Sequence, residues 1–227
     1  MFPRSAQKEW MDDFSIQDER IDGALKELAV INTWLGGHAA SRAGVRSLLR
    51  RIPEGDGVSI LDVGAGGSDF AHAVSALRPG IRVTALDRNE RACAYASRMF
   101  PEVRTIRGSV LDLPFENNSF DIVHASLFLH HFTDPELRRI IPRLYAVARY
   151  GIVVNDLRRS TAALAGISIL TRFFSHSAMV QNDAPLSVRR AFTRDDIDRL
   201  CSYVPDRKAV IRRKWAFRWL VYIGKDA

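Results

Sequence analysis

Residues 60–70 read ILDVGAGGSDF, an apolar run followed by a glycine-rich turn. The apolar run before the glycines is typical of a strand that is buried on both faces. Gly64 and Gly66 allow the backbone to approach a ligand closely, and a helix that follows them offers unpaired N–H groups to it. The stretch therefore predicts a buried strand, a ligand-binding turn and a helix.

Short β-rich runs alternate with helix-length segments after residue 57, which indicates an α/β fold with a parallel sheet covered on both faces. Two further runs near the C-terminus predict an antiparallel hairpin at the sheet edge. The first set of runs is 58–63, 81–86, 103–106, 120–125 and 151–154, and the second set is 209–213 and 217–223.

The chain before the first strand is expected to be helical. Ile21, Leu25 and Leu28 recur at helical spacing, and Gly36 with Gly37 marks a break before a second helix. Residues 1–52 are thus predicted to form an N-terminal helical cap, and residues 53–227 the main domain. Within that domain, residues 157–192 form a long insertion that we interpret as a lid.

Composition restricts the class of protein. Apolar residues make up 47% and charged residues 26% of 227, as in an ordinary globular protein. No uncharged run reaches the ~18 residues of a membrane-spanning helix, and Lys8 and Glu9 lie where a signal peptide would be apolar. We expect a cytoplasmic protein. Cys93 and Cys201 are too few for a disulfide framework or a zinc pattern, so no metal is expected.

The net charge of +7 leaves an anionic partner such as RNA open. Part of the excess lies near the C-terminus, where alternating charged and apolar residues fit an exposed strand face equally well. These basic residues are Arg207, Lys208, Arg212, Arg213, Lys214 and Arg218.

Asp87 follows the second predicted strand, where a carboxylate can accept hydrogen bonds from both hydroxyls of a ribose. A dinucleotide fingerprint anchored on Gly64 would place Asp69 beside a pyrophosphate, which is electrostatically unfavourable. A P-loop would require a lysine that this region lacks. The turn and the carboxylate together predict a different nucleoside cofactor.

The pattern Asp62-x-Gly64-x-Gly66-x-Ser68 resembles the first motif of class I S-adenosylmethionine-dependent methyltransferases, acidic-x-Gly-x-Gly-x-Gly. The stretch RGSVLDLPFENNSFDIVHASLFLHHF at 107–132 is similar to a second part of the family pattern. The resemblance covers about residues 58–160 and is closest to the ubiquinone/menaquinone-biosynthesis-like and small-molecule O-methyltransferase branch. It implies a Rossmann-like fold with a mostly parallel seven-stranded sheet.

The same resemblance implies S-adenosylmethionine as the cofactor. Ser68 replaces the third glycine, and Ser109 stands where the family usually has an adenine-contacting Asp, so Asp112 is an alternative contact. The implied cofactor-binding residues are Asp62, Gly64, Ala65, Gly66, Asp87, Arg88, Ser109, Val110, Leu111, Asp112 and Ser126.

The candidate catalytic residues follow the fourth and fifth strands, at the edge where parallel sheets bind ligands. Histidine, with a pKa near ~6.5, is suited to act as a general base, and a nearby carboxylate can orient it. Some similar small-molecule O-methyltransferases use a His pair in an LHH segment with an Asp at the end of strand five. The matching residues here are His130, His131 and Asp156.

These features favour a small, largely apolar aromatic or polyketide-like acceptor, methylated on a hydroxyl or an activated carbon, in secondary metabolism. An RNA methyltransferase remains open because of the charge, although residues 125–128 lack the Asp/Asn-Pro-Pro-aromatic motif of amino-methylating nucleic-acid enzymes. A non-catalytic cofactor-binding regulator and a homodimer also remain open. The predicted substrate-binding residues are Trp34, His38, Asn155, Arg158, Phe173, His176 and Arg189.

Overall fold

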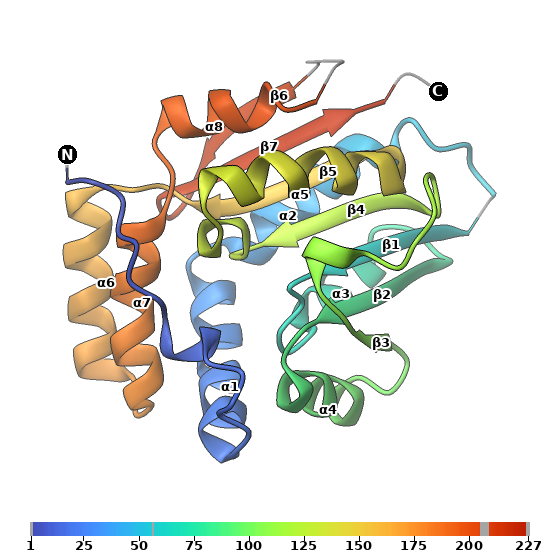
Figure 1. The fold of residues 1–227 in the computed structure, drawn as a ribbon. Helices are drawn as coiled ribbons and strands as arrows, with labels where there is room; N and C mark the ends of the chain where they lie inside the picture. Colours follow the sequence, from blue (N-terminus) through green and yellow to red (C-terminus); the bar gives the residue numbers. More distant parts are fainter. Residues whose placement is uncertain (1, 56, 205–208, 226–227) are drawn as a thin grey trace.

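A central twisted sheet with helices on both faces organises the molecule (Figure 1). The computed structural model describes residues 2–55, 57–204 and 209–225, so Arg207 and Lys208 of the predicted basic cluster lie outside the described residues. The seven strands have the order β3-β2-β1-β4-β5-β7-β6. Their bounds are β1 Val58–Val63, β2 Ile81–Asp87, β3 Arg104–Arg107, β4 Phe120–Ser126, β5 Ala148–Leu157, β6 Ala209–Lys214 and β7 Arg218–Gly224.

The strand pairing confirms the predicted sheet. β1 lies in the centre and pairs in parallel with β2 and β4, while β3 and β5 extend the parallel sheet on either side. β7 pairs antiparallel with both β5 and β6, so the predicted C-terminal hairpin forms one edge. Because β1, β4 and β5 carry apolar side chains on both faces, they form the interior of the sheet.

Helices cover the two faces of this sheet. α2 and α3 pack on one face through side chains such as Val45, Leu48 and Phe70, and α5 and α8 pack on the other through Leu144 and Ile197. The helix bounds are α1 Glu19–Trp34, α2 Gly37–Leu49, α3 Asp69–Ser75, α4 Glu90–Met99, α5 Asp134–Val147, α6 Thr161–Phe174, α7 Ala178–Arg190 and α8 Arg194–Cys201, with short 3-10 turns η1 Trp10–Asp12, η2 Val110–Asp112 and η3 Leu129–His131.

The predicted cap and lid meet beyond the carboxyl ends of the parallel strands. There α1 stands beside α7, which packs on α6 (Figure 1). Ile21 and Leu25 of α1 form a buried cluster with Tyr95 of α4 and Met179 of α7. α2, by contrast, packs directly on β5 and β7, so the N-terminal helices contribute to both the sheet and the insertion. The described residues contain no helix with the length and apolar character needed to cross a membrane.

Arg218 corrects the expectation of an exposed basic strand face. Its side chain is only 2% exposed, and it donates hydrogen bonds to the Leu35 carbonyl oxygen at 3.1 Å and to Asn32 Oδ1 at 3.0 Å. Burial lowers the pKa of Arg218 to about 10. This arginine therefore ties β7 to the end of α1 and does not belong to a surface that binds anions.

Candidate active site

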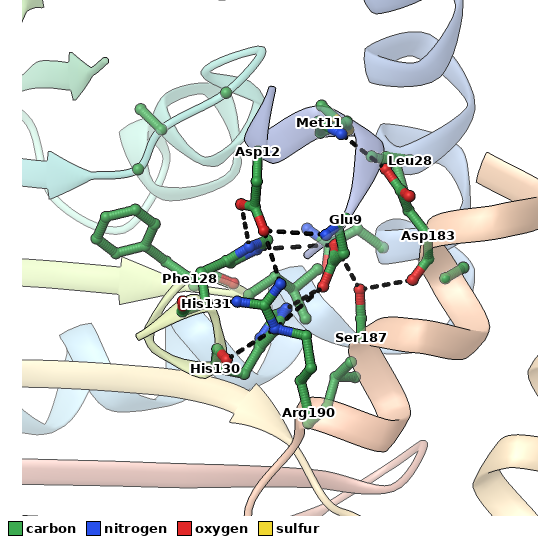
Figure 2. A pocket seen from close by; sticks show the side chains of 18 of the residues that line it. Glu9, Met11, Asp12, Leu28, Phe128, His130, His131, Asp183, Ser187 and Arg190 are labelled. Carbon is green, nitrogen blue, oxygen red and sulfur yellow. Dashed lines mark hydrogen bonds and ion pairs between the residues drawn. The ribbon is translucent and has the colours of Figure 1, made fainter. Parts of the chain in front are cut away.

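One cavity of about 940 Å³ opens at the carboxyl ends of β1, β2 and β4. The glycine-rich turn and Asp87 line one half of it. His130, His131 and the N-terminal segment, residues 4–14, line the other half (Figure 2). Apolar side chains from α1, α6 and α7 complete the wall, among them Leu28 and Ile167. The predicted ligand edge of the sheet is therefore a real cavity with two chemically different halves.

The glycine-rich turn has the backbone conformation that the sequence requires. Gly64 and Gly66 have φ values of +66° and +50°, in the left-handed region that favours glycine. A Cβ atom on Gly64 would lie 2.0 Å from Cδ2 of Phe128, so a side chain has no room there. The turn therefore presents bare backbone to the cavity.

Asp87 is fixed in the wall by the turn itself. The Gly66 N–H donates to Asp87 Oδ2 at 2.8 Å, and the Asn89 N–H donates to Asp87 Oδ1 at 2.8 Å. Burial raises the pKa of Asp87, while these N–H groups oppose the rise. Each oxygen keeps a lone pair free for a further donor, which is what recognition of a diol requires.

Ser109 also lies in this half of the cavity. Its hydroxyl oxygen accepts a hydrogen bond from the Leu111 N–H at 3.2 Å, at the start of η2. The hydroxyl hydrogen remains free to donate to a ligand. Asp112, the alternative adenine contact, is exposed and outside the cavity wall.

Behind the turn, Asp62 belongs to a buried hydrogen-bonded chain that the sequence did not indicate. Asp62 Oδ1 is 2.7 Å from His124 Nδ1, and His124 Nε2 is 2.8 Å from Ser41 Oγ. Ser41 Oγ accepts from Asn155 Nδ2 at 3.0 Å, and the same amide donates to the Gly37 carbonyl oxygen. The chain links α2 to three strands, so Asn155 holds the scaffold together outside the cavity wall.

Of the two predicted substrate-binding residues at the bend between α1 and α2, one lines the cavity. His38 lines the cavity, and its Nε2 is 2.6 Å from Asp69 Oδ2, beside the glycine-rich turn. Trp34 is 81% exposed and lies outside the wall. The acidic side chain that argued against a pyrophosphate is thus paired with an imidazole.

In the other half of the cavity, the structure brings together all three predicted catalytic residues. His130 Nδ1 is 2.7 Å from Asp156 Oδ1, and His131 follows on η3 with its ring 4.3 Å from that of His130. Burial disfavours a charged imidazole, but Asp156 and Glu9 outweigh this effect and raise the pKa of His130 to about 9. Asp156 responds in the opposite direction, because the charge of His130 lowers its pKa against the effect of burial.

Two carboxylates from the N-terminal segment complete this half. Glu9 is 5% exposed, and its Oε1 is 3.5 Å from His130 Nε2, while its Oε2 is 3.9 Å from His131 Nε2. Asp12 Oδ1 is 2.7 Å from His131 Nδ1. The pKa of Asp12 is well below its usual range because hydrogen bonding to His131 and the charge of Arg190 outweigh burial.

Arg190, at the end of α7, holds the N-terminal segment in place. Its Nη1 donates to Asp12 Oδ2 at 2.6 Å and to the Gln7 carbonyl oxygen at 3.1 Å. Its Nη2 donates to the His131 carbonyl oxygen at 2.6 Å, and its Nε to that of His130 at 3.3 Å. A single guanidinium therefore connects α7, the N-terminal segment and the His pair (Figure 2).

α7 also contacts the N-terminal segment through two residues that lie one and two helical turns before Arg190. Asp183 accepts hydrogen bonds from the Trp10 and Met11 N–H groups at 2.8 and 3.0 Å, and the Ser187 hydroxyl donates to Glu9 Oε2 at 2.9 Å. Positions 183, 187 and 190 share one helix face. Polar residues on the inward face of α7 are the sequence signal that could have indicated this contact.

Some of the remaining predicted site residues line the cavity, and the others lie outside its wall. Arg158, Phe173, His176 and Arg189 are outside the wall, and Phe173 is 76% exposed. Their roles in substrate binding remain predictions. The predicted cofactor-binding residues that line the cavity are Asp62, Gly64, Ala65, Gly66, Asp87, Arg88, Ser109, Val110, Leu111 and Ser126.

Comparison with known proteins agrees with this geometry. Residues 60–151 match the family model described as methyltransferase domain. The crystal structure of human N-acetylserotonin methyltransferase in complex with S-adenosylmethionine has a TM-score of 0.67, with 14% identity over 98% of this chain and 60% of that one. Residues 60–151 are a methyltransferase domain, and the chain has the fold of class I methyltransferases. The predicted family and fold are confirmed, and S-adenosylmethionine is the cofactor of this family.

The methyltransferase domain also has relatives in sequence. An uncharacterized methyltransferase of Synechocystis sp. is 31% identical over 113 residues, which are 49% of this chain and 52% of that protein. A demethylmenaquinone methyltransferase of Geobacillus stearothermophilus is 27% identical over 135 residues, which are 57% of each protein. The chain therefore spans about half the length of these curated relatives.

Replacing Arg190 tests how the methyltransferase domain holds its N-terminal segment. Arg190→Met removes the guanidinium that pairs with Asp12, and we expect the free energy of unfolding to fall by about 3 kcal/mol because a buried charge loses its partner. Trypsin should also cleave sooner after Lys8. The exposed neighbour provides the matched control, since Arg189→Met should change neither measurement. Equal stability and equal cleavage of the two variants would contradict the contact.

Proposed function

We propose that this protein transfers a methyl group from S-adenosylmethionine to a hydroxyl of a small, largely apolar aromatic or polyketide-like acceptor. The main support for this proposal is that one cavity is lined both by the glycine-rich turn and by a buried cluster of histidines and carboxylates. Positioning two reactants in one enclosed site can supply much of the catalysis of such a displacement.

The cofactor half fits S-adenosylmethionine by its donors and acceptors. Asp87 offers carboxylate oxygens to ribose hydroxyls, and the turn at Gly64 to Gly66 offers backbone to the methionine end. Ser109 offers a hydroxyl hydrogen to the adenine, which compensates for the missing family Asp. When bound, the cofactor supplies an electrophilic methyl group on its sulfonium.

The acceptor half supports a small molecule over a nucleic acid. Leu28 of α1, Ile167 and Leu170 of α6 and Val188 of α7 line it, and small-ligand sites have such apolar walls with a few polar groups for orientation. The N-terminal segment lies across the His pair and narrows the approach. The names of the relatives, demethylmenaquinone and N-acetylserotonin methyltransferases, also indicate small acceptors.

The His pair supplies the polar groups that a hydroxyl needs. Asp156 and Asp12 each take one Nδ1, so both Nε2 atoms are directed to the same point in the cavity, next to Glu9. We expect an acceptor hydroxyl to bind there and to lose its proton to an imidazole in its neutral form as the methyl group arrives; because the pKa of His130 is about 9, this ring is neutral only at alkaline pH. In this proposal His130 and His131 are catalytic, and Asp156 is a positioning residue.

The cofactor assignment is tested by replacing Asp87. Asp87→Ala should weaken S-adenosylhomocysteine binding about tenfold to hundredfold, because one charged hydrogen-bond acceptor is worth ~1.5–3 kcal/mol. Calorimetry measures the affinity, and Asp195→Ala, an exposed site on α8, is the control. Unchanged binding by a folded Asp87→Ala variant would show that the ribose is held elsewhere.

The catalytic assignment is tested by replacing each histidine. His130→Ala or His131→Ala should lower kcat by ~10²- to 10⁴-fold on a panel of hydroxylated aromatics while S-adenosylhomocysteine affinity is retained. His72→Ala, at an exposed site on α3, should match the wild type. Total RNA is assayed in parallel at ~50 and ~200 mM salt, the range over which phosphate contacts are lost.

Two results would contradict the proposal. The first is wild-type kcat in both histidine variants, which would place the chemistry elsewhere. The second is methylation confined to RNA with a steep salt dependence, which would exclude the small acceptor. Binding of S-adenosylhomocysteine without turnover of any acceptor would instead favour a regulatory cofactor-binding protein.

A further inference from the structure

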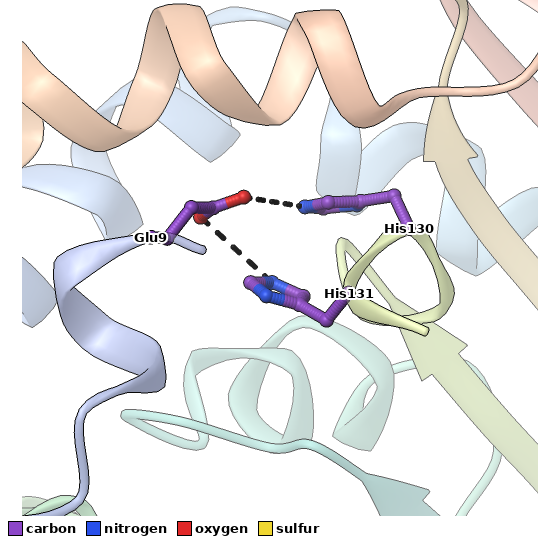
Figure 3. A group of neighbouring side chains, drawn as sticks. All are labelled: Glu9, His130 and His131. Carbon is purple, nitrogen blue, oxygen red and sulfur yellow. Dashed lines mark ion pairs between the residues drawn. The ribbon is translucent and has the colours of Figure 1, made fainter. Parts of the chain in front are cut away.

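We propose that Glu9, His130 and His131 form a binding site for one divalent transition-metal ion of the Zn²⁺ or Fe²⁺ type, at the acceptor end of the cavity (Figure 3). Each residue offers one ligand atom, and these atoms lie within 4.8 Å of one another. Two imidazoles and one carboxylate are a ligand set that such ions bind while keeping coordination positions open.

The distances between the ligand atoms suit a cation. His130 Nε2 is 3.5 Å from Glu9 Oε1, and His131 Nε2 is 3.9 Å from Glu9 Oε2. Two ligands at ~2.1 Å from a tetrahedral zinc are about 3.4 Å apart. A direct N–H···O hydrogen bond would require about 2.9 Å. The two distances between carboxylate and imidazole are therefore closer to the spacing of ligands around an ion than to that of a direct hydrogen bond.

The buried atoms at this point lack hydrogen-bond partners. Glu9 Oε1 and His130 Nε2 are both shielded from solvent, and neither makes a hydrogen bond within the described structure. The two side chains are 5% and 2% exposed. Leaving such groups unsatisfied is costly, and a bound cation would satisfy both at once.

The groups around the ligands have the arrangement that orients histidines toward metals. Asp156 is 2.7 Å from His130 Nδ1, and Asp12 is 2.7 Å from His131 Nδ1. A carboxylate that accepts from Nδ1–H fixes the neutral ring with its lone pair on Nε2, the atom that binds metal. In this tautomer both rings present lone pairs toward the Glu9 carboxylate, so a metal ion would take the place of the proton that His130 Nε2 otherwise carries.

The local charge balance agrees with a divalent ion. Once a metal ion has displaced the proton of His130, both imidazoles are neutral and Glu9, Asp12 and Asp156 bring three negative charges. The Arg190 guanidinium brings one positive charge, 2.6 Å from Asp12 and 3.9 Å from Glu9. The remaining charge of minus two matches one divalent cation. These hydrogen bonds of Arg190 go to Asp12 and to backbone carbonyl oxygens, and none of them occupies an Nε2 atom of the His pair.

The site deepens the proposed function and, for its role in the reaction, rests on it. A hydroxyl that binds to a divalent ion releases its proton to solvent at lower pH than a free hydroxyl, because the cation stabilises the oxyanion. The His pair would then act as ligands and the ion as the group that activates the hydroxyl. Metal binding itself can be measured without any acceptor.

The experiment is a Co²⁺ titration of untagged full-length protein stripped with EDTA. Visible absorption reports nitrogen and oxygen ligation, and Zn²⁺ competition confirms a shared site. We expect one equivalent of Co²⁺ to bind. Glu9→Gln and His131→Ala should each weaken binding by more than the ~10- to 100-fold expected from Asp12→Asn, since those two remove ligands and Asp12 only orients one.

The controls His72→Ala and Glu116→Gln, at exposed sites, should bind Co²⁺ as the wild type does. S-adenosylhomocysteine affinity and thermal unfolding establish that each variant is folded. Absence of stoichiometric binding to the wild type, or wild-type affinity in Glu9→Gln and His131→Ala, would overturn the site. Methyl transfer at full rate by stripped protein would overturn its role and leave the proposed function intact, whereas stoichiometric metal without methyl transfer would contradict only the function.

Discussion

The need to pair buried charge is the constraint on which the acceptor half of this molecule depends. Asp156 at the end of β5 and Glu9 and Asp12 in the N-terminal segment are directed at the same two imidazoles. A buried carboxylate without a partner is strongly destabilising. The N-terminal segment and η3 must therefore lie together, and Arg190 fixes both to α7.

The cofactor half is built on a different principle. There the decisive features are backbone conformation and the sheet, because the glycine turn follows β1 and Asp87 follows β2, its parallel neighbour. Adjacent parallel strands end at the same edge, so both features reach the cavity through local sequence alone. The two halves can consequently be altered separately. Substitutions in the glycine turn or at Asp87 change the cofactor half, and substitutions of the paired charged residues change the acceptor half.

This difference explains what the sequence could predict. Strands, the glycine turn, Asp87 and the contact of His130 with Asp156 follow from local patterns and from strand ends meeting at one edge. Glu9 and Asp12 lie in an irregular segment with no periodic pattern, and only tertiary contacts place them. Those residues carried no signal beyond their charge.

Asn155 shows a limit of another kind. It precedes Asp156 on β5, and successive residues of a strand point to opposite faces, so only one of the two could reach the His pair. Asn155 faces Ser41 of α2, and its Nδ2 lies within hydrogen-bond distance of Ser41 Oγ, the Gly37 carbonyl oxygen and Ser126 Oγ of β4. The alternation of side chains along a strand could therefore have shown from the sequence that Asn155 and Asp156 do not both face the His pair.

We assign the N-terminal segment to the acceptor half of the cavity and not to the cofactor half. The most direct test measures S-adenosylhomocysteine affinity and single-turnover methyl transfer on one preparation of the full-length Glu9→Gln/Asp12→Asn variant. If this assignment holds, the affinity for S-adenosylhomocysteine equals that of the wild type. The rate of methyl transfer is lower by at least ~100-fold, as expected when acid–base catalysis is lost. Methyl transfer at the wild-type rate by this folded variant would contradict it.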